Sequence, residues 1–136
     1  MTGHGRVLHP ELTPEQRRRL FERGVDLFNR AAFYDCHEVF EEIWRSTTPE
    51  PRDLFQGLIQ VAVGLHHYLQ RGNPAAGRRV LGRGLKRLAP LGPAACGLDL
   101  ETLCAAAERW QEWLANADGV PPPLPRLRAA GKWAPG

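Results

Sequence analysis

The chain has few cysteines and few lysines, and both shortages are informative. Its 136 residues include three cysteines, an odd number with no Cys-x-x-Cys spacing, which argues against a disulfide framework and against a zinc knuckle. Lysine occurs only as Lys86 and Lys132, so the cationic residues are almost all arginine. A GC-rich coding bias explains this composition more readily than nucleic-acid binding does, because the net charge of +3 is mild. We therefore do not expect a nucleic-acid partner.

Long apolar runs are also absent. No stretch approaches the roughly 18 apolar residues of a membrane span, and the N-terminus lacks the apolar centre of a signal peptide. We therefore expect a cytoplasmic protein with no membrane partner. A chain of 136 residues is long enough for one domain to bury a self-sufficient core without support from metals or disulfides.

Apolar periodicity and chain-breaking residues divide the sequence into about five helices. The expected helices cover residues 14–31, 33–44, 52–71, 74–88 and a stretch that begins after Asp99. Residues 1–12 lack periodicity and are predicted to be a flexible leader, and residues 13–118 to be the helical bundle. Residues 119–136 begin with a run of prolines, which predicts a polyproline-type strap packed across the bundle through Leu124, Leu127 and Trp133. The predicted fold is a compact all-α bundle.

Capping residues predict where these helices begin. Thr13 is a favourable N-cap, with proline at the next position and Gln16 completing a capping box. Asn73 precedes a proline in the same way and should start the helix 74–88. Asp35 stands three residues before Glu38, so we expect it to cap the helix that contains them.

The predicted helix 52–71 is apolar almost all round, which places it at the centre of the bundle. Its polar exceptions include Gln56, Gln60 and His66. A buried amide or imidazole must find a partner or lose about 1–3 kcal/mol. The short proline-rich connection before this helix makes it antiparallel to the preceding helix, which could supply the partners.

The preceding helix, residues 33–44, carries the chemically informative side chains. His37 and Glu41 lie one turn apart at the edge of its apolar stripe, an arrangement that suits two metal ligands or an acid and base pair. The antiparallel register places His37 level with Gln60 or Val61, and Glu41 level with Gln56 or Gly57. His66 lies about 7.5 Å further along the axis than the level of His37, at 1.5 Å per residue.

Together these residues resemble the signature of the DUF309 family of small helical proteins. The matching residues are Phe33, Tyr34, His37, Glu38, Glu41 and Trp44, then Leu54, Gln56, Gly57, Leu58, Ile59, Gln60, Ala62 and His66, then Gly72 and Asn73. The resemblance covers about residues 28–88. It implies a compact all-α fold and carries the family's general description as predicted metal-dependent hydrolases, with no established substrate.

The first functional hypothesis is therefore a metal-dependent hydrolase. His37, Glu41 and His66 would bind a divalent zinc, manganese or iron ion, because two imidazoles and a carboxylate suit these metals. Glu38 would act as the catalytic base on metal-bound water. The His-Glu-x-x-Glu order differs from the His-Glu-x-x-His zinc signature, in which both histidines share one helix face. The remaining site residues, which would orient a ligand or the substrate, are Gln56, Gln60 and Trp44.

The second hypothesis is a non-enzymatic helical binding or assembly module. In this case the same polar residues form a buried hydrogen-bond network that fixes the packing of the two helices, and exposed aromatic residues mark the surface of a homodimer or partner. Two weaker alternatives are a Cys36 nucleophile and nucleic-acid binding by the arginines of helix 74–88. His37 diverges from Cys36 by about 100° on the helix, and no aromatic residues interleave those arginines.

Overall fold

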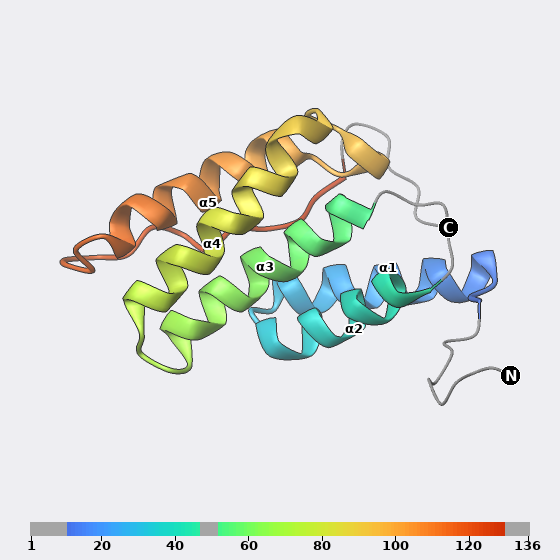
Figure 1. The fold of residues 1–136 in the computed structure, drawn as a ribbon, viewed down its shortest axis with the longest axis horizontal. Coiled ribbons are helices and arrows are strands. Elements are labelled where there is room, and N and C mark those ends of the chain that lie inside the picture. Colours follow the sequence, from blue (N-terminus) through green and yellow to red (C-terminus); the bar gives the residue numbers. More distant parts are fainter. Residues whose placement is uncertain (1–10, 47–51, 130–136) are drawn as a thin grey trace, which may run out of the picture.

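The computed structural model of the protein describes residues 11–46 and 52–129. Five α-helices make up most of this part of the chain, and none of its residues forms a strand (Figure 1). The helices are α1 (Pro14–Asn29), α2 (Phe33–Arg45), α3 (Arg52–Leu69), α4 (Pro74–Leu88) and α5 (Leu100–Leu114), with short 3-10 helices η1 (Ala89–Leu91) and η2 (Ala95–Gly97). The predicted all-α bundle is confirmed. Within the described ranges, no helix has the length and apolar character of a membrane span.

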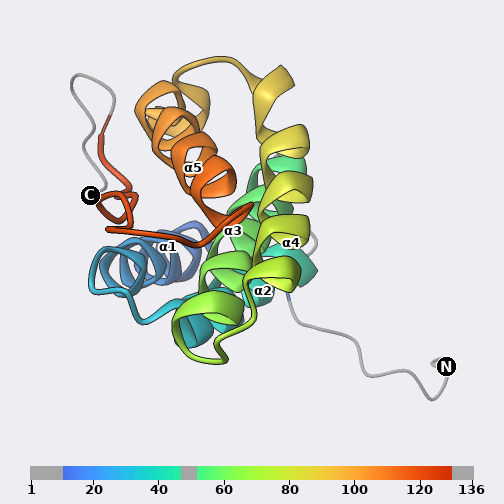
Figure 2. The same ribbon diagram turned by 90° about the vertical axis from the view of Figure 1, so that its left-hand side faces the viewer.

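Helix α3 lies at the centre of the bundle, as its all-round apolar character predicts. It packs against α2 on one side and against α4 on the other, α1 covers α2, and α5 covers α4 (Figures 1 and 2). Its fully or nearly fully buried residues are Leu54, Phe55, Gly57, Leu58, Val61, Ala62, Gly64 and Leu65. Both flanks of α3 are therefore occupied by other helices, and this position decides which way each of its polar side chains faces.

Glycines bring the backbones of α3 and α4 into direct contact. A Cβ atom added at Gly64 would lie 2.8 Å from the backbone nitrogen of Leu81 and 3.0 Å from the carbonyl oxygen of Gly77. A Cβ atom added at Gly84 would lie 2.9 Å from the carbonyl oxygen of Gly57. These separations are shorter than normal van der Waals contacts, so the two helices can pack this closely only because these positions carry no side chain.

Two of the predicted N-caps are confirmed, and one is wrong. Thr13 accepts a hydrogen bond from the backbone N–H of Gln16 and completes the capping box, and Asn73 accepts one from the N–H of Ala76. Asp35 does not cap α2. That helix begins two residues earlier, at Phe33, after an N-cap residue that makes no side-chain hydrogen bond.

Packing accounts for the early start of α2. Phe33 is buried, and its ring packs edge-on against Phe28 of α1 with 5.1 Å between ring centroids. Between the two helices, Ala31 has a positive φ of 63°, which reverses the chain within three residues. Burial of an aromatic ring stabilises the fold by more than a single capping hydrogen bond does. The contact of Phe33 with the core therefore sets the first residue of the helix.

The described part of the proline-rich tail crosses α5 and α1 (Figure 2). Trp110 of α5 donates its Nε1–H to the carbonyl oxygen of Pro123 (2.8 Å). Asn29 of α1 exchanges two hydrogen bonds with the backbone of Leu127, at 2.9 and 2.7 Å, and Leu127 is 2% exposed. Leu124 is 40% exposed, so it is covered less completely than Leu127, and its packing on the bundle stays a prediction. The predicted boundaries between leader and bundle, after residue 12, and between bundle and tail, after residue 118, stay predictions.

Three regions with sequence expectations lie outside the described residues. They are most of the predicted leader (1–10), most of the proline-rich connection (47–51) and the end of the tail (130–136), which includes Trp133.

Candidate functional site

Helices α2 and α3 run antiparallel, as predicted, and this direction brings two imidazoles together. Tyr34 near the start of α2 lies beside His66 near the end of α3, while Arg52 at the start of α3 covers the ring of Trp44 at the end of α2. The Tyr34 ring lies 4.8 Å from the His37 ring and 5.3 Å from the His66 ring, between centroids. We call Tyr34, His37 and His66 the imidazole edge. Tyr34 is 52% exposed, so this edge is open to solvent.

The orientation of His37 is fixed by its own helix. Its Nδ1 lies 2.6 Å from the backbone carbonyl oxygen of Tyr34. A carbonyl oxygen can only accept a hydrogen bond, so Nδ1 carries the proton and Nε2 is an acceptor in the neutral imidazole. Nε2 makes no hydrogen bond to any described residue. His37 therefore presents a bare acceptor at the imidazole edge.

His66 has a buried polar atom without a partner. Its Nδ1 is buried and makes no hydrogen bond to any residue that the structure describes. Burial lowers the pKa of His66, and the nearby charges of His67, Arg71 and His37 lower it further. The imidazole is therefore neutral at pH 7, because its pKa lies below the ordinary value of about 6.5. A neutral imidazole can donate from one ring nitrogen and accept at the other.

Glu41 and Trp44 lie further along α2. Glu41 accepts a hydrogen bond from Arg45 of the same helix (2.9 Å), so its carboxylate is already paired. The Trp44 ring carries the Arg52 guanidinium 4.5 Å above its centroid, a cation–π contact. Its Nε1–H is buried and has no hydrogen-bond partner within residues 11–46 and 52–129. Trp44 thus resembles His66 in holding an unsatisfied polar atom between α2 and α3.

The expectation that Gln60 faces α2 is wrong. Gln60 accepts a hydrogen bond from Arg87 of α4 (3.1 Å), and Arg87 also forms an ion pair with Asp53 (3.0 Å). Gln60 lies three residues after Gly57 and four before Gly64, the glycines at which α3 contacts α4, so it shares their helix face. Register alone placed it level with His37 but could not determine which neighbour it faces.

Gln56 and Glu38 also remain apart from the imidazole edge. Gln56 is half-buried on α3 and makes no hydrogen bond to a described residue. Glu38 is exposed on the outer side of α2 and forms no ion pair with a described residue. The structure does not place Glu38 against the ring nitrogen of either histidine.

The three predicted metal ligands do not converge. Within residues 11–46 and 52–129, no three His, Cys, Asp or Glu side chains are grouped closely enough to hold a metal ion. Glu41 lies one turn beyond His37 towards the end of α2, whereas His66 lies beside Tyr34 in the opposite direction. The predicted hydrogen-bond network is also missing, because His37 and Glu41 bond within α2 and His66 Nδ1 has no partner.

Comparison with known proteins assigns this part of the chain to a family. Residues 21–80 match the family model DUF309, described as a domain of unknown function. Over these residues the chain belongs to the DUF309 family. The match runs from Phe21 of α1 to Val80 of α4 and includes the whole imidazole edge.

Two relatives are similar to the chain over different lengths. The Bacillus subtilis (strain 168) protein named Uncharacterized protein YpuF is 35% identical over 57 residues, which are 41% of this chain and 32% of the relative. An Aquifex aeolicus (strain VF5) protein named Uncharacterized protein is 32% identical over 107 residues, which are 77% of this chain and 31% of the relative. The chain therefore spans about a third of the length of these relatives.

The DUF309 segment also contains Cys36, the weaker candidate for a nucleophile. Cys36 is fully buried in the core. Burial raises the pKa of its thiol far above the ordinary value, so no thiolate forms at neutral pH. The structure therefore contradicts the cysteine-nucleophile alternative.

Tyr34 is the site residue that the sequence interpretation missed. It lies three residues before His37, so the helical spacing placed both on one face of α2. It also helps to line a shallow cavity of about 150 Å³ at the start of α2, together with His66 of α3 and Gln70 just after the end of α3. The antiparallel register could have found this contact, because it brings the start of α2 level with the end of α3.

Proposed function

We propose that this DUF309 protein is a cytoplasmic, non-enzymatic helical binding module that engages a ligand or partner at the imidazole edge. The observation that carries the proposal is a buried polar atom of this edge, His66 Nδ1, which has no hydrogen-bond partner among the described residues. Cys36 and Cys104 form no disulfide, which is typical of a reducing compartment and supports the cytoplasm.

Unsatisfied polar atoms indicate a binding role because they weaken the free protein. A buried donor or acceptor without a partner costs about 1–3 kcal/mol, and natural proteins contain few of them. A ligand that supplies the missing hydrogen bonds recovers this free energy on binding. The free energy that an unsatisfied polar atom costs in the free protein therefore adds to the affinity for such a ligand.

The chemistry of the edge defines what it can bind. His37 offers an acceptor at Nε2, His66 is neutral and can donate or accept, and Tyr34 adds an exposed aromatic ring. A ligand with both a donor and an acceptor next to an apolar or aromatic group matches this set. No group at the edge supplies a nucleophile or a converged acid and base pair, so binding without catalysis is the simpler function.

A metal-dependent hydrolase is the second candidate, and one observation favours it. Histidines that ligate metals commonly donate the distal ring N–H to a backbone carbonyl, as His37 does to Tyr34. The proposed ligand set does not fit, because the Glu41 carboxylate is paired with Arg45 and does not join the two imidazoles. No catalytic step through a metal follows from these residues.

A metal titration separates the two candidates. Equilibrium dialysis of the protein against zinc, manganese or iron(II) is expected to show no tight site that depends on His37 and His66. Micromolar binding that is lost in both His37→Ala and His66→Ala, and kept in the control His67→Ala, would favour the hydrolase instead.

A ligand screen then tests the binding module directly. Small aromatic amides and azoles, which carry a donor and an acceptor on an apolar ring, are screened by ligand-observed NMR. Hits are expected to bind the wild type and His67→Leu, and to lose binding in His66→Leu. Hits that bind all three proteins equally, or an absence of hits, would contradict the proposed edge.

A further inference from the structure

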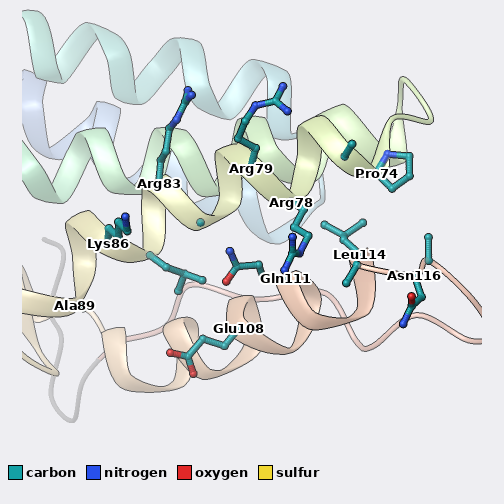
Figure 3. A pocket seen from close by; sticks show the side chains of 15 residues that line it. Pro74, Arg78, Arg79, Arg83, Lys86, Ala89, Glu108, Gln111, Leu114 and Asn116 are labelled. Carbon is teal, nitrogen blue, oxygen red and sulfur yellow. The ribbon is translucent and has the colours of Figure 1, made fainter.

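A groove of about 970 Å³ lies between α4 and α5, and none of the three residues of the imidazole edge lines it (Figure 3). We call it the basic groove. Its cationic residues, all from α4, are Arg78, Arg79, Arg83 and Lys86. Glu108 of α5 is the acidic residue among those that line it. None of the four cations forms an ion pair with a described residue, and all four are exposed.

The cations spread from the groove across the outer surface of α4. Arg78 points towards Gln111 of α5, whereas Arg79 and Arg83 point to the other side of α4 (Figure 3). Arg79 and Arg83 are four residues apart, which corresponds to about 6 Å along the helix axis. The surface therefore suits a partner that carries several carboxylates one helical turn apart.

One surface of the same protein has this character. The outer side of α2 carries Asp35, Glu38 and Glu42, which are all exposed and form no ion pair with a described residue. We call these three residues the acidic face. Glu38 and Glu42 are four residues apart, so their spacing equals that of Arg79 and Arg83.

The two surfaces cannot meet within one copy of the chain. Helix α3 lies between α2 and α4, and the acidic face is on the side of α2 away from the core (Figures 1 and 2). Single-stranded nucleic acid is a weaker match to the groove, because no aromatic side chain lines it for base stacking. Opposite unpaired charges at matching spacing favour a second copy of the chain.

We propose that the acidic face of one copy docks on the exposed α4 arginines Arg79 and Arg83, beside the basic groove, of a second copy. The contact is head-to-tail, since two different surfaces meet, and the pair of copies keeps one free surface of each kind. Association therefore continues into a ring or an open chain of copies. Asp35 borders the cavity at the imidazole edge, but Glu38, Glu42 and the α4 arginines do not line it, so self-association through these residues is tested separately from the proposed ligand binding.

Sedimentation velocity across a concentration series tests the proposal. At about 20 mM salt, the protein is expected to form species heavier than the monomer. The association should weaken roughly tenfold or more at about 300 mM salt, because exposed charges are screened. A protein that stays monomeric at low salt, or whose association ignores salt, overturns the proposal.

Charge reversal identifies the surfaces. The double variants R79E/R83E and E38R/E42R should each be monomeric, because each then carries two surfaces of like charge. An equimolar mixture of the two variants again contains complementary surfaces and should assemble. Assembly of either variant alone at the wild-type concentration, or a mixture that stays monomeric, overturns the assignment.

A matched control excludes an effect of net charge. R19E/R23E reverses two exposed α1 arginines and changes the net charge by the same amount as R79E/R83E. It should associate like the wild type, and loss of association in this variant would contradict the proposal. Circular dichroism establishes that every variant is folded, and R79Q/R83Q replaces R79E/R83E if charge reversal unfolds the protein.

Discussion

Replacement of His66 by leucine tests whether the unpartnered imidazole serves binding or folding. Leucine has a similar volume and no polar atom, so it removes the buried Nδ1 that has no hydrogen bond. An unsatisfied buried polar atom costs about 1–3 kcal/mol, part of which this substitution should recover. We expect the free energy of unfolding of His66→Leu to equal or exceed that of the wild type, by up to about 1 kcal/mol.

A urea titration followed by circular dichroism measures this difference. A gain of about 1 kcal/mol should raise the melting temperature by about 3 °C in a domain of this size. His67→Leu is the matched control, because His67 is the next residue of α3 and has no buried unpartnered atom. Its unfolding free energy should stay within about 0.5 kcal/mol of the wild type.

The opposite result would refute the reasoning. If His66 belonged to a structural hydrogen-bond network, its replacement would leave the partner unsatisfied. A loss of about 1–3 kcal/mol in His66→Leu, with no loss in the control, would then show that the imidazole stabilises the fold.

Three further predictions follow from other contacts. Gly64→Ala should lose about 1–3 kcal/mol in urea titration, because its Cβ would meet backbone atoms of α4 that cannot move aside; an unchanged midpoint would contradict the close contact. Asn29→Ala should lose about 1–3 kcal/mol and expose the tail near Leu127 to proteases, since two hydrogen bonds are removed, while the exposed control Asn116→Ala should change neither. The wild type should lose stability as the pH falls below about 6.5, because the lowered pKa of His66 makes the unfolded state bind the proton more readily. His66→Leu should lose less over the same range, and equal losses in both proteins would exclude this histidine as the cause.

The sequence predicted those features of the fold that depend on local chemistry and on one helix at a time. Thr13 and Asn73 mark helix starts through their own side-chain hydrogen bonds, so they could be identified without a structure. Helix α3 is apolar on all sides, and a helix of this kind is stable in water only when other helices surround it. The antiparallel pairing of α2 and α3 followed from the short connection between them.

The site was harder to predict because it depends on which neighbour each helix face meets. Gln60 and His66 are both polar residues of α3, but Gln60 faces α4 and His66 faces α2. Glu41 was expected among the metal ligands, yet Arg45 is one turn away and pairs with it. Periodicity places a residue on a helix face, but it does not identify the partner when two helices flank the same element.

The backbone contact between α3 and α4 also constrains how the molecule can move. Where Gly64 and Gly77 meet, there are no side chains that could change rotamer and let one helix slide along the other. We therefore expect α3 and α4 to keep their positions relative to each other when other parts of the molecule move. A ligand at the imidazole edge would then shift α1 and α2 relative to α3 and α4 together.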